Sequence, residues 1–434
     1  MKKVLTIVVA CALGVATAGQ ALATDSRING LSAGGANFGP NGPNFNEKSV
    51  TIRDSANIYP MPQFMVTYKN SVDVDATNAN VYGTMNVRYA LSDDSVLLLF
   101  GKRSAWRPVA KVQSIGGKNA ATEAGFTAHD GLDPTNHQFG VGYGMKAGES
   151  LRLGTTLSLG GARADGDVNK QDNNYLLDLN FGLGLDLNET NNLDFALGFS
   201  FGGFTNVEGP QDRYLSDGGQ FSFTLLAKGE FQVHQIAKMV PFFRLNYDGH
   251  GVAHFARQSE IGSGNEAKRG HLRNTSINFG TDLAISPVEG VLIQPGLGLG
   301  IRLSGVDGNS APGPQGSGIG ERPVESSRQF LPYYGFAAEA KAFEWLVLRL
   351  GARQTIVRTD NDNTVVVPQG APAQSNESKA SSVNNTVSTG LGIKMMGWDL
   401  DVNMNPAFFN NGPFAVTGNA TGGFGIDFAL GYDW

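Results

Sequence analysis

Apolar and polar residues alternate in segment after segment of this 434-residue chain, from about residue 63 to its end. Residues 177–185 read LDLNFGLGL, with leucine or phenylalanine at every second position. Successive side chains of a β-strand point to opposite faces, so this pattern predicts strands with one apolar and one polar face. Sixteen such segments can be counted: 64–68, 81–91, 95–100, 139–145, 151–159, 175–187, 193–201, 221–231, 241–247, 277–285, 291–303, 330–340, 346–352, 387–395, 398–404 and 426–434.

The connections between these segments alternate in length. Short links fall at 92–94, 147–149, 188–191, 287–290, 343–344 and 396–397. Long links rich in Gly, Asn, Asp, Pro and Ser fall at 102–136, 162–174, 203–219, 249–272, 305–327, 355–383 and 405–420. Alternation of tight turns with long loops is typical of transmembrane barrels. The pattern predicts an all-β, closed antiparallel transmembrane barrel over residues 61–434, with about sixteen strands, and fourteen or eighteen would also fit.

A soluble sandwich or barrel is the alternative fold. It would need a second layer to cover so many apolar strand faces, and the sequence offers none. Charged residues make up 17% of the chain, below the roughly 25% usual for soluble domains. This composition favours the transmembrane barrel.

The N-terminus has the layout of a secretory signal peptide. Lys2 and Lys3 precede an apolar run, and the small residues around Leu22 offer a cleavage site near Ala23. We therefore expect residues 1–23 to be removed; a short buried helix is the alternative. The chain's one cysteine, Cys11, lies in this run, so the exported form is expected to fold without disulfides.

The last strand is amphipathic up to the C-terminus. Residues 426, 428, 430, 432 and 434 are all apolar or aromatic, and the chain ends on an aromatic residue. This ending resembles the terminal signal of Gram-negative outer-membrane β-barrels, porin-like proteins among them. The resemblance implies an outer-membrane location and recognition by the barrel assembly machinery. The residues expected to serve assembly and the aromatic girdle at the membrane surface are Trp398, Phe428, Tyr432 and Trp434.

The polar parity of the strands carries charges of both signs. Charges that point into a barrel need water or partners. They predict either the wall of a water-filled pore or pairs that hold the wall together, and the mixed signs do not decide between cation and anion selectivity. The pore-lining candidates are Arg88, Arg152, Lys228, Glu230, Arg244, Asp282, Arg302, Glu339, Lys341, Arg349, Arg353 and Lys394.

Residues 24–60 show no strand period and are interpreted as a periplasmic leader or a plug in the lumen. The stretch IRDSANIYPMPQF resembles the N-terminal region of outer-membrane long-chain fatty-acid transporters, although the Asn-Pro-Ala motif of that family is absent. Rows of inward glycines, such as Gly140, Gly142 and Gly144, allow something inside the barrel to approach closely. That could be residues 24–60 or the loop 102–136.

No catalytic, cofactor or metal motif stands out. His250 and His254 have the right spacing for a metal but lie in an expected loop, and the acidic loop 165–173 lacks the glycine and terminal glutamate of a calcium loop. The formal net charge is −6 with no basic block, which argues against nucleic-acid binding. The sequence predicts no enzyme.

The leading functional hypothesis is a porin-like channel for passive diffusion of small polar solutes or ions. The first alternative is a plugged outer-membrane transporter for hydrophobic substrates, for which Phe242, Tyr333 and Trp345 are the apolar residues on the lumen parity. The second is a structural barrel that sheathes a partner or displays adhesive loops. The expected partners are the outer-membrane bilayer, the assembly machinery and small solutes, and a homotrimer is an open alternative.

Overall fold

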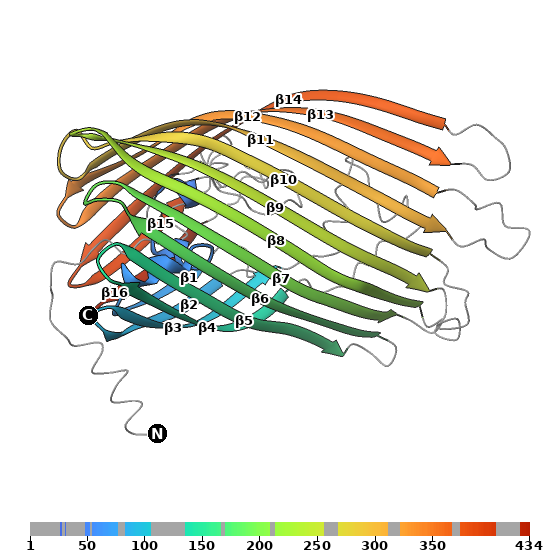
Figure 1. Cartoon of the computed structure of the whole chain (residues 1–434), viewed down its shortest axis with the longest axis horizontal. Coiled ribbons are helices and arrows are strands. Elements are labelled where there is room, and N and C mark those ends of the chain that lie inside the picture. Colours follow the sequence, from blue (N-terminus) through green and yellow to red (C-terminus); the bar gives the residue numbers. More distant parts are fainter. Residues whose placement is uncertain are drawn as a thin grey trace, which may run out of the picture.

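The fold is a closed antiparallel barrel of sixteen strands, as the alternation predicts (Figure 1). Each strand pairs with its neighbours in sequence, and β1 pairs with β16 to close the ring. The computed structural model describes residues 27, 31, 48–52, 54–76, 83–105, 135–165, 170–208, 213–255, 268–310, 322–366, 374–404 and 426–434. Within these residues, no helix is both long enough and apolar enough to cross a membrane.

The strands differ in length around the barrel: they lengthen from β1 to β8, stay long through β14, and are short again in β15 and β16. β1, β15 and β16 have six to eight residues, whereas β8, β12 and β14 have twenty-two. The bounds are β1 Ser71–Ala76, β2 Gly83–Ser92, β3 Ser95–Ala105, β4 Thr135–Ala147, β5 Leu151–Asp165, β6 Lys170–Asp186, β7 Asn192–Glu208, β8 Arg213–His234, β9 Ala237–Phe255, β10 Lys268–Ile285, β11 Val291–Ser310, β12 Arg322–Phe343, β13 Leu346–Val366, β14 Gln374–Met395, β15 Trp398–Met404 and β16 Ile426–Asp433.

The first predicted strand, 64–68, is wrong. Residues Pro62–Val66 form a 3-10 helix, η2, and the barrel begins at β1. Pro60 and Pro62 cannot donate ladder hydrogen bonds, which disfavours a strand here. Phe64, Met65 and Val66 are all buried, so the segment has no exposed face that a period of two could mark. The closing partner of β16 is therefore β1, with Tyr432 opposite Val72, and not the segment near Phe64.

Strands extend into most of the segments that were predicted as long loops. β13 runs to Val366 and β14 begins at Gln374, so residues 355–366 and 374–383 of the predicted loop 355–383 belong to strands. Residues 377–385 of β14 are exposed on both parities. A strand that is wet on both faces loses the alternation by which it could be recognised.

The two faces of the barrel differ in chemistry. Outward side chains form aromatic pairs between neighbouring strands: the Phe199 and Phe223 ring centroids are 5.5 Å apart, and those of Phe201 and Phe221 are 5.4 Å apart. Exposed large apolar residues such as Phe139, Leu159 and Leu297 belong to the same face. The opposite parity faces the lumen and holds the charged residues, which the next section describes.

Candidate functional site in the barrel lumen

An N-terminal segment lies inside the barrel, near the end where the short turns connect the strands (Figure 1). We use this name for Arg27, Leu31 and the described part of residues 48–68. It includes the helical turns α3 (Lys48–Thr51), η1 (Ser55–Ile58) and η2. The η2 helix is buried and contacts β3, β4, β5 and β6.

Four inward glycines let η2 approach the barrel wall. A Cβ at Gly154 would lie 2.2 Å from the carbonyl carbon of Pro62, and one at Gly182 would lie 2.8 Å from the backbone nitrogen of Gln63. Cβ atoms at Gly142 and Gly144 would lie 3.1 Å from the Met65 side chain. We call Gly142, Gly144, Gly154 and Gly182 the glycine groove. A side chain at Gly154 would clash with backbone, so the groove is matched to this segment.

An apolar cluster joins the N-terminal segment to the lumen wall. Phe64, Met61, Met65, Ile58 and Val50 pack against inward residues of the strands. The wall residues are Val96, Leu98 and Phe100 of β3, Leu226 of β8, Phe242 of β9, and Leu331 and Tyr333 of β12. The sequence indicated Phe242 and Tyr333. It predicted the strand at 95–100 but did not indicate which of its residues face the lumen, because the run VLLLF is apolar on both faces. Trp345, the third expected residue, is instead exposed in the β12–β13 turn.

Two cations flank the buried ring of Phe64. The guanidinium carbon of Arg152 lies 5.7 Å from the ring centroid, and Lys228 Nζ lies 5.1 Å from it. Each cation also has a carboxylate: Arg152 Nη2 is 2.8 Å from Asp186 Oδ1, and Lys228 Nζ is 3.1 Å from Glu230 Oε1. A cation over an aromatic face is worth about 2 kcal/mol when desolvated. Phe64 is therefore held by electrostatics as well as by packing.

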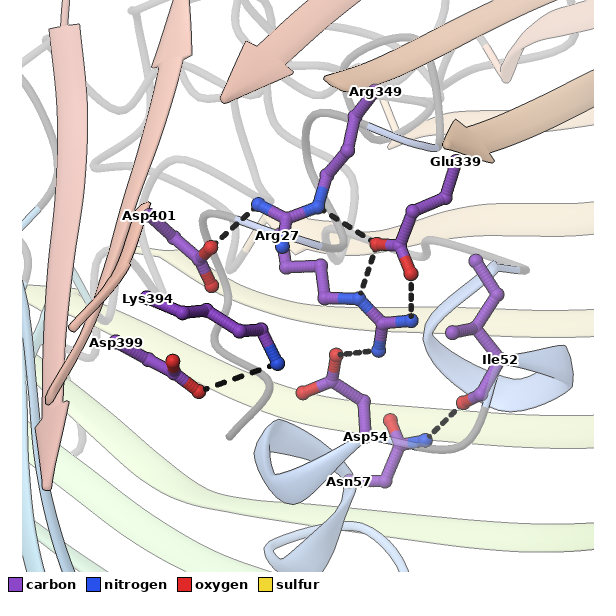
Figure 2. A network of polar contacts seen from close by, with 9 residues as sticks. All are labelled: Arg27, Ile52, Asp54, Asn57, Glu339, Arg349, Lys394, Asp399 and Asp401. Atoms are coloured by element: carbon purple, nitrogen blue, oxygen red, sulfur yellow. Dashed lines mark hydrogen bonds and ion pairs between the residues drawn. The ribbon is translucent and has the colours of Figure 1, made fainter. Parts of the chain in front are cut away.

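A second group of lumen charges, the Glu339 network, contacts the segment from the other side of the barrel (Figure 2). The Arg27 guanidinium donates from Nε to Glu339 Oε2 at 2.8 Å and from Nη2 to Oε1 at 3.1 Å. Its Nη1 reaches Asp54 Oδ2 at 3.1 Å. Arg349 Nε also donates to Glu339 Oε2, at 2.8 Å, and Arg349 pairs with Asp401. Glu339 is thus shared by one arginine of the segment and one of the wall.

Burial in the lumen opposes the charge on Arg27. The carboxylates of Glu339 and Asp54 outweigh that penalty and raise the pKa of the Arg27 guanidinium above its usual value. An arginine paired in this way stays charged at every pH at which the protein is folded. The contact between Arg27 and Glu339 is therefore a permanent ion pair while the segment is in place.

Hydrogen bonds from uncharged side chains hold the N-terminal segment to β10 and β11 on the same side of the lumen. Thr51 Oγ1 donates to Asp282 Oδ2 at 2.6 Å, and Gln294 Nε2 donates to Thr51 Oγ1 at 3.1 Å. Leu31 and Ile52 pack with Ala337 of β12 in a small buried cluster. The N-terminal segment thus bridges the lumen from the glycine groove on β4–β6 to β10–β12.

The structure divides the twelve predicted lumen residues into groups. Arg152, Lys228, Glu230, Asp282, Glu339 and Arg349 lie at or next to the N-terminal segment, and Lys394 is 3.7 Å from Asp399 beside the Glu339 network. Arg88 pairs with Asp73 near the seam, and Arg353 stacks on Tyr333 at 4.3 Å. Arg244 donates to Asn246 at 2.9 Å, and Arg302 lies partly buried on β11. Lys341 is exposed close to a turn and joins none of these groups.

The expected girdle residues meet at the seam. The Tyr432 ring is 4.7 Å from the Trp398 ring and 6.4 Å from that of Trp434. The backbone of Phe428 lies opposite Val402 of β15, and Trp434 N donates to the carbonyl oxygen of Asn70 at 3.0 Å. These contacts hold the end of the chain against both neighbouring strands.

Several predictions fall outside the described residues: the signal peptide 1–23, most of residues 24–47, and 166–169 of the acidic loop. His250 and His254 lie in β9 and not in a loop. Among the described side chains, no group of three or more His, Cys, Asp or Glu residues is arranged to hold a metal ion.

No protein-family model matches the sequence, and no curated protein matches it. Several solved structures are similar in shape. The ferric-catecholate import receptor Fiu of E. coli K12 is 10% identical over 84% of this chain and 81% of that chain, with a TM-score of 0.39. The ferric yersiniabactin uptake receptor FyuA of Yersinia pestis is 8% identical over 84% and 80%, also with a TM-score of 0.39. TM-scores of this size carry no conclusion about the activity of this chain.

Proposed function

We propose that this chain is an outer-membrane transport barrel whose lumen is closed by its own N-terminal segment. The observation that carries the proposal is the burial of η2 in the glycine groove, with Arg27 bound to Glu339 across the lumen. The exposed apolar outer face and the amphipathic terminal strand support a bilayer around the barrel. The signal peptide expected at residues 1–23 supports export, and residues 24–60 then act as the plug and not as a periplasmic leader.

The lumen wall favours a hydrophobic or amphipathic cargo. Once the N-terminal segment moves, Leu98, Phe100, Leu226, Phe242 and Leu331 would line the path that it leaves. These residues come from β3, β8, β9 and β12, so they surround the path instead of forming one stripe. A molecule with apolar surface would replace the contacts that the segment gives up.

The charge arrangement allows the segment to leave the wall. If Arg27 departs together with Asp54, each keeps the other as a partner. Glu339 keeps Arg349, and Arg349 keeps Asp401. When the segment separates from the wall, no buried charge is therefore left without a partner. An unpaired buried charge is what makes most buried ion pairs costly to break.

A passive pore for small polar solutes is the second candidate. A polar ladder on the lumen side of β8–β10 favours it: Thr224 donates to Asn246 at 2.9 Å, and Asn246 donates to Ser276 at 3.1 Å. Such a wall suits water and hydrated solutes. It would conduct continuously only if the N-terminal segment were displaced.

An engineered disulfide between the N-terminal segment and the wall, formed and reduced at will, tests the proposal. A Cβ at Gly144 would lie 3.1 Å from Met65 Cβ, slightly closer than the roughly 3.5–4.5 Å of a disulfide. We expect the Met65→Cys/Gly144→Cys variant to form this bond when oxidised. In planar bilayers and in uptake of a fluorescent fatty acid into proteoliposomes, the oxidised form should be closed and the reduced form active. The single variant Gly144→Cys is the matched control and should not respond to reductant.

The results separate the candidates. Uptake of the apolar probe only after reduction supports the plugged transporter. Passage of sugars and ions but not of the apolar probe after reduction would favour the gated porin. Steady conductance in the oxidised variant, with the disulfide shown by mass spectrometry, would contradict a plug.

A further inference from the structure

Four neighbouring short turns each expose one large apolar side chain. They are Ile236 between β8 and β9, Val288 between β10 and β11, Trp345 between β12 and β13, and Met396 between β14 and β15. Their exposed fractions are 43%, 63%, 52% and 86%. We call these four residues the turn arc. Tight turns are normally built from Gly, Asn, Asp, Pro and Ser, so a large exposed apolar residue in each of four neighbouring turns is unusual.

Met396 has an unfavourable backbone conformation for a residue with a large side chain. Met396 has φ 53° and is followed by Gly397 at φ 82°. Two positive φ angles in a two-residue hairpin loop define a turn that favours Asn-Gly. Methionine is strained in this left-handed conformation. The Met396 side chain is also the most exposed large apolar side chain of the described residues. A residue with a strained backbone and an exposed apolar side chain indicates that the side chain has a role.

Turns on the other side of the same barrel end are different. The β2–β3 turn contains Asp93 and Asp94, and the β4–β5 turn contains Glu149, all exposed. The β6–β7 turn between them and the arc is mixed, with Leu187 and Glu189. Each turn of the arc thus exposes one large apolar side chain, with Glu289 beside Val288 and Glu344 beside Trp345, whereas the β2–β3 and β4–β5 turns expose acidic residues and no large apolar side chain.

We propose that the turn arc is immersed in the headgroup region of the bilayer, while the acidic turns stay in water, so that the barrel sits tilted in its membrane. This inference rests on the transmembrane location in the proposed function. The occupant that fits the arc is lipid, because the arc continues the outward apolar face. Phe343 on that face stacks on Trp345, with centroids 5.7 Å apart and an interplanar angle of 7°.

Two further features fit a lipid surface better than a protein partner. Adjacent hairpin turns are roughly 10 Å apart, about twice the strand spacing, so the four side chains stand singly around a curve and form no continuous patch. Aromatic rings gather at the same end, where Tyr432 contacts both Trp398 and Trp434. Trp and Tyr are enriched at the membrane–water interface.

Site-specific quenching tests the tilt. The chain has one cysteine, in the expected signal peptide, so an introduced cysteine is the single labelling site of the exported protein. A bimane label would be placed in turn at Ile236→Cys, Val288→Cys, Trp345→Cys and Met396→Cys. Asp94→Cys and Glu149→Cys are the matched turn controls, and Val141→Cys on the outward face of β4 reports insertion. The quenchers are a lipid with a nitroxide near its headgroup and aqueous iodide.

The expected result is at least twofold stronger lipid quenching at the four arc positions than at Asp94→Cys and Glu149→Cys, with the reverse order for iodide. Equal iodide quenching at all six turns, with Val141→Cys quenched by lipid, overturns the tilt but leaves the transmembrane barrel intact. Protection of the arc from both quenchers also overturns it, because a protein would then cover the arc. Loss of lipid quenching at Val141→Cys as well contradicts the proposed membrane location itself.

Discussion

Arg27 and Glu339 are 312 positions apart in the sequence and form a two-point contact, Nε to Oε2 at 2.8 Å and Nη2 to Oε1 at 3.1 Å. The planar fork of the guanidinium matches the two carboxylate oxygens, which makes such pairs stronger than single hydrogen bonds. One partner belongs to the N-terminal segment and the other to β12 of the wall. This pair is therefore the contact through which we expect the closed state to be controlled.

Glu339→Gln should weaken closure without unfolding the barrel. Arg27 keeps Asp54 and Arg349 keeps Asp401, so no charge is left alone. A hydrogen bond to a charged group is worth roughly 1.5–3 kcal/mol, which converts to a roughly 10- to 100-fold rise in the open-to-closed ratio. Single-channel recording measures it. Lys379→Ala, on the exposed part of β14, should leave the ratio unchanged, and an unaltered ratio in Glu339→Gln would count against the pair as a latch.

Gly154→Ala should expel η2 from the glycine groove. The added Cβ would lie 2.2 Å from the carbonyl carbon of Pro62, and backbone at this point cannot turn aside as a side chain can. Limited proteolysis of the reconstituted protein should then cut the N-terminal segment faster. Gly101→Ala is the matched control, since its Cβ would meet Phe139 at an ordinary 3.8 Å. Equal cleavage of the two variants would mean that the groove does not hold the segment.

Phe64→Leu and Phe64→Ala separate packing from cation–π attraction. Phe→Ala in a core costs about 3–5 kcal/mol, whereas leucine restores most of the apolar volume but gives Arg152 and Lys228 no ring. Hydrogen exchange of the amides of residues 62–68 should accelerate strongly in the alanine variant and by about tenfold in the leucine variant. If Phe64→Leu exchanges as slowly as the native protein, the two cations contribute nothing through the ring.

Trp434→Ser should impair assembly, and removal of residues 425–434 should abolish it. The short version lacks β16, so β1 and β15 lose their shared partner and the ring cannot close. Heat-modifiable migration of outer-membrane fractions on gels measures assembly. Trp345→Ser, a tryptophan in a turn away from the seam, is the control. Normal levels and normal heat resistance in both end variants would contradict an assembly role for this strand.

Met396→Asn should stabilise the folded barrel in detergent. Asparagine tolerates the left-handed backbone that Met396 adopts at φ 53°, and relief of this strain is worth about 1 kcal/mol. Denaturant midpoints in detergent micelles measure the change. Met396→Leu keeps the strain and the apolar character, so it should not raise the midpoint.

The strands could be predicted because the outer surface and the lumen of the barrel impose opposite chemistry on successive residues. Fifteen of the sixteen segments overlap a strand of the barrel, including the short 95–100 and 398–404. The exception, 64–68, carries the same alternation of apolar residues but lies in the lumen. A period of two reports a strand only where its two faces meet different surroundings, and Phe64 and Met65 are both buried.

The long-loop predictions failed for the related reason that strands continue into water. Residues 374–383 pair along β13 although neither of their faces is apolar, and the polar stretch QSNESKASS gives no strand period. For the charged residues, the sequence predicts the face of the strand but not the partner. Glu339 has the parity of a lumen residue, but parity cannot say whether its partner is water, Arg349 or an arginine 312 positions away.

The amino-acid pattern was enough to predict a closed antiparallel barrel with its C-terminal strand at the seam, because these follow from local periodicity and from loop lengths. Rows of inward glycines indicated that a segment approaches the wall from inside, but no local pattern decided between residues 24–60 and the loop 102–136. Contacts of Arg27 with Glu339, of Pro62 with Gly154 and of Thr51 with Asp282 join distant parts of the chain. Such contacts form only once ring closure brings β4–β6 and β10–β12 to face each other across the lumen, and so only the folded barrel shows that its N-terminal segment fills it.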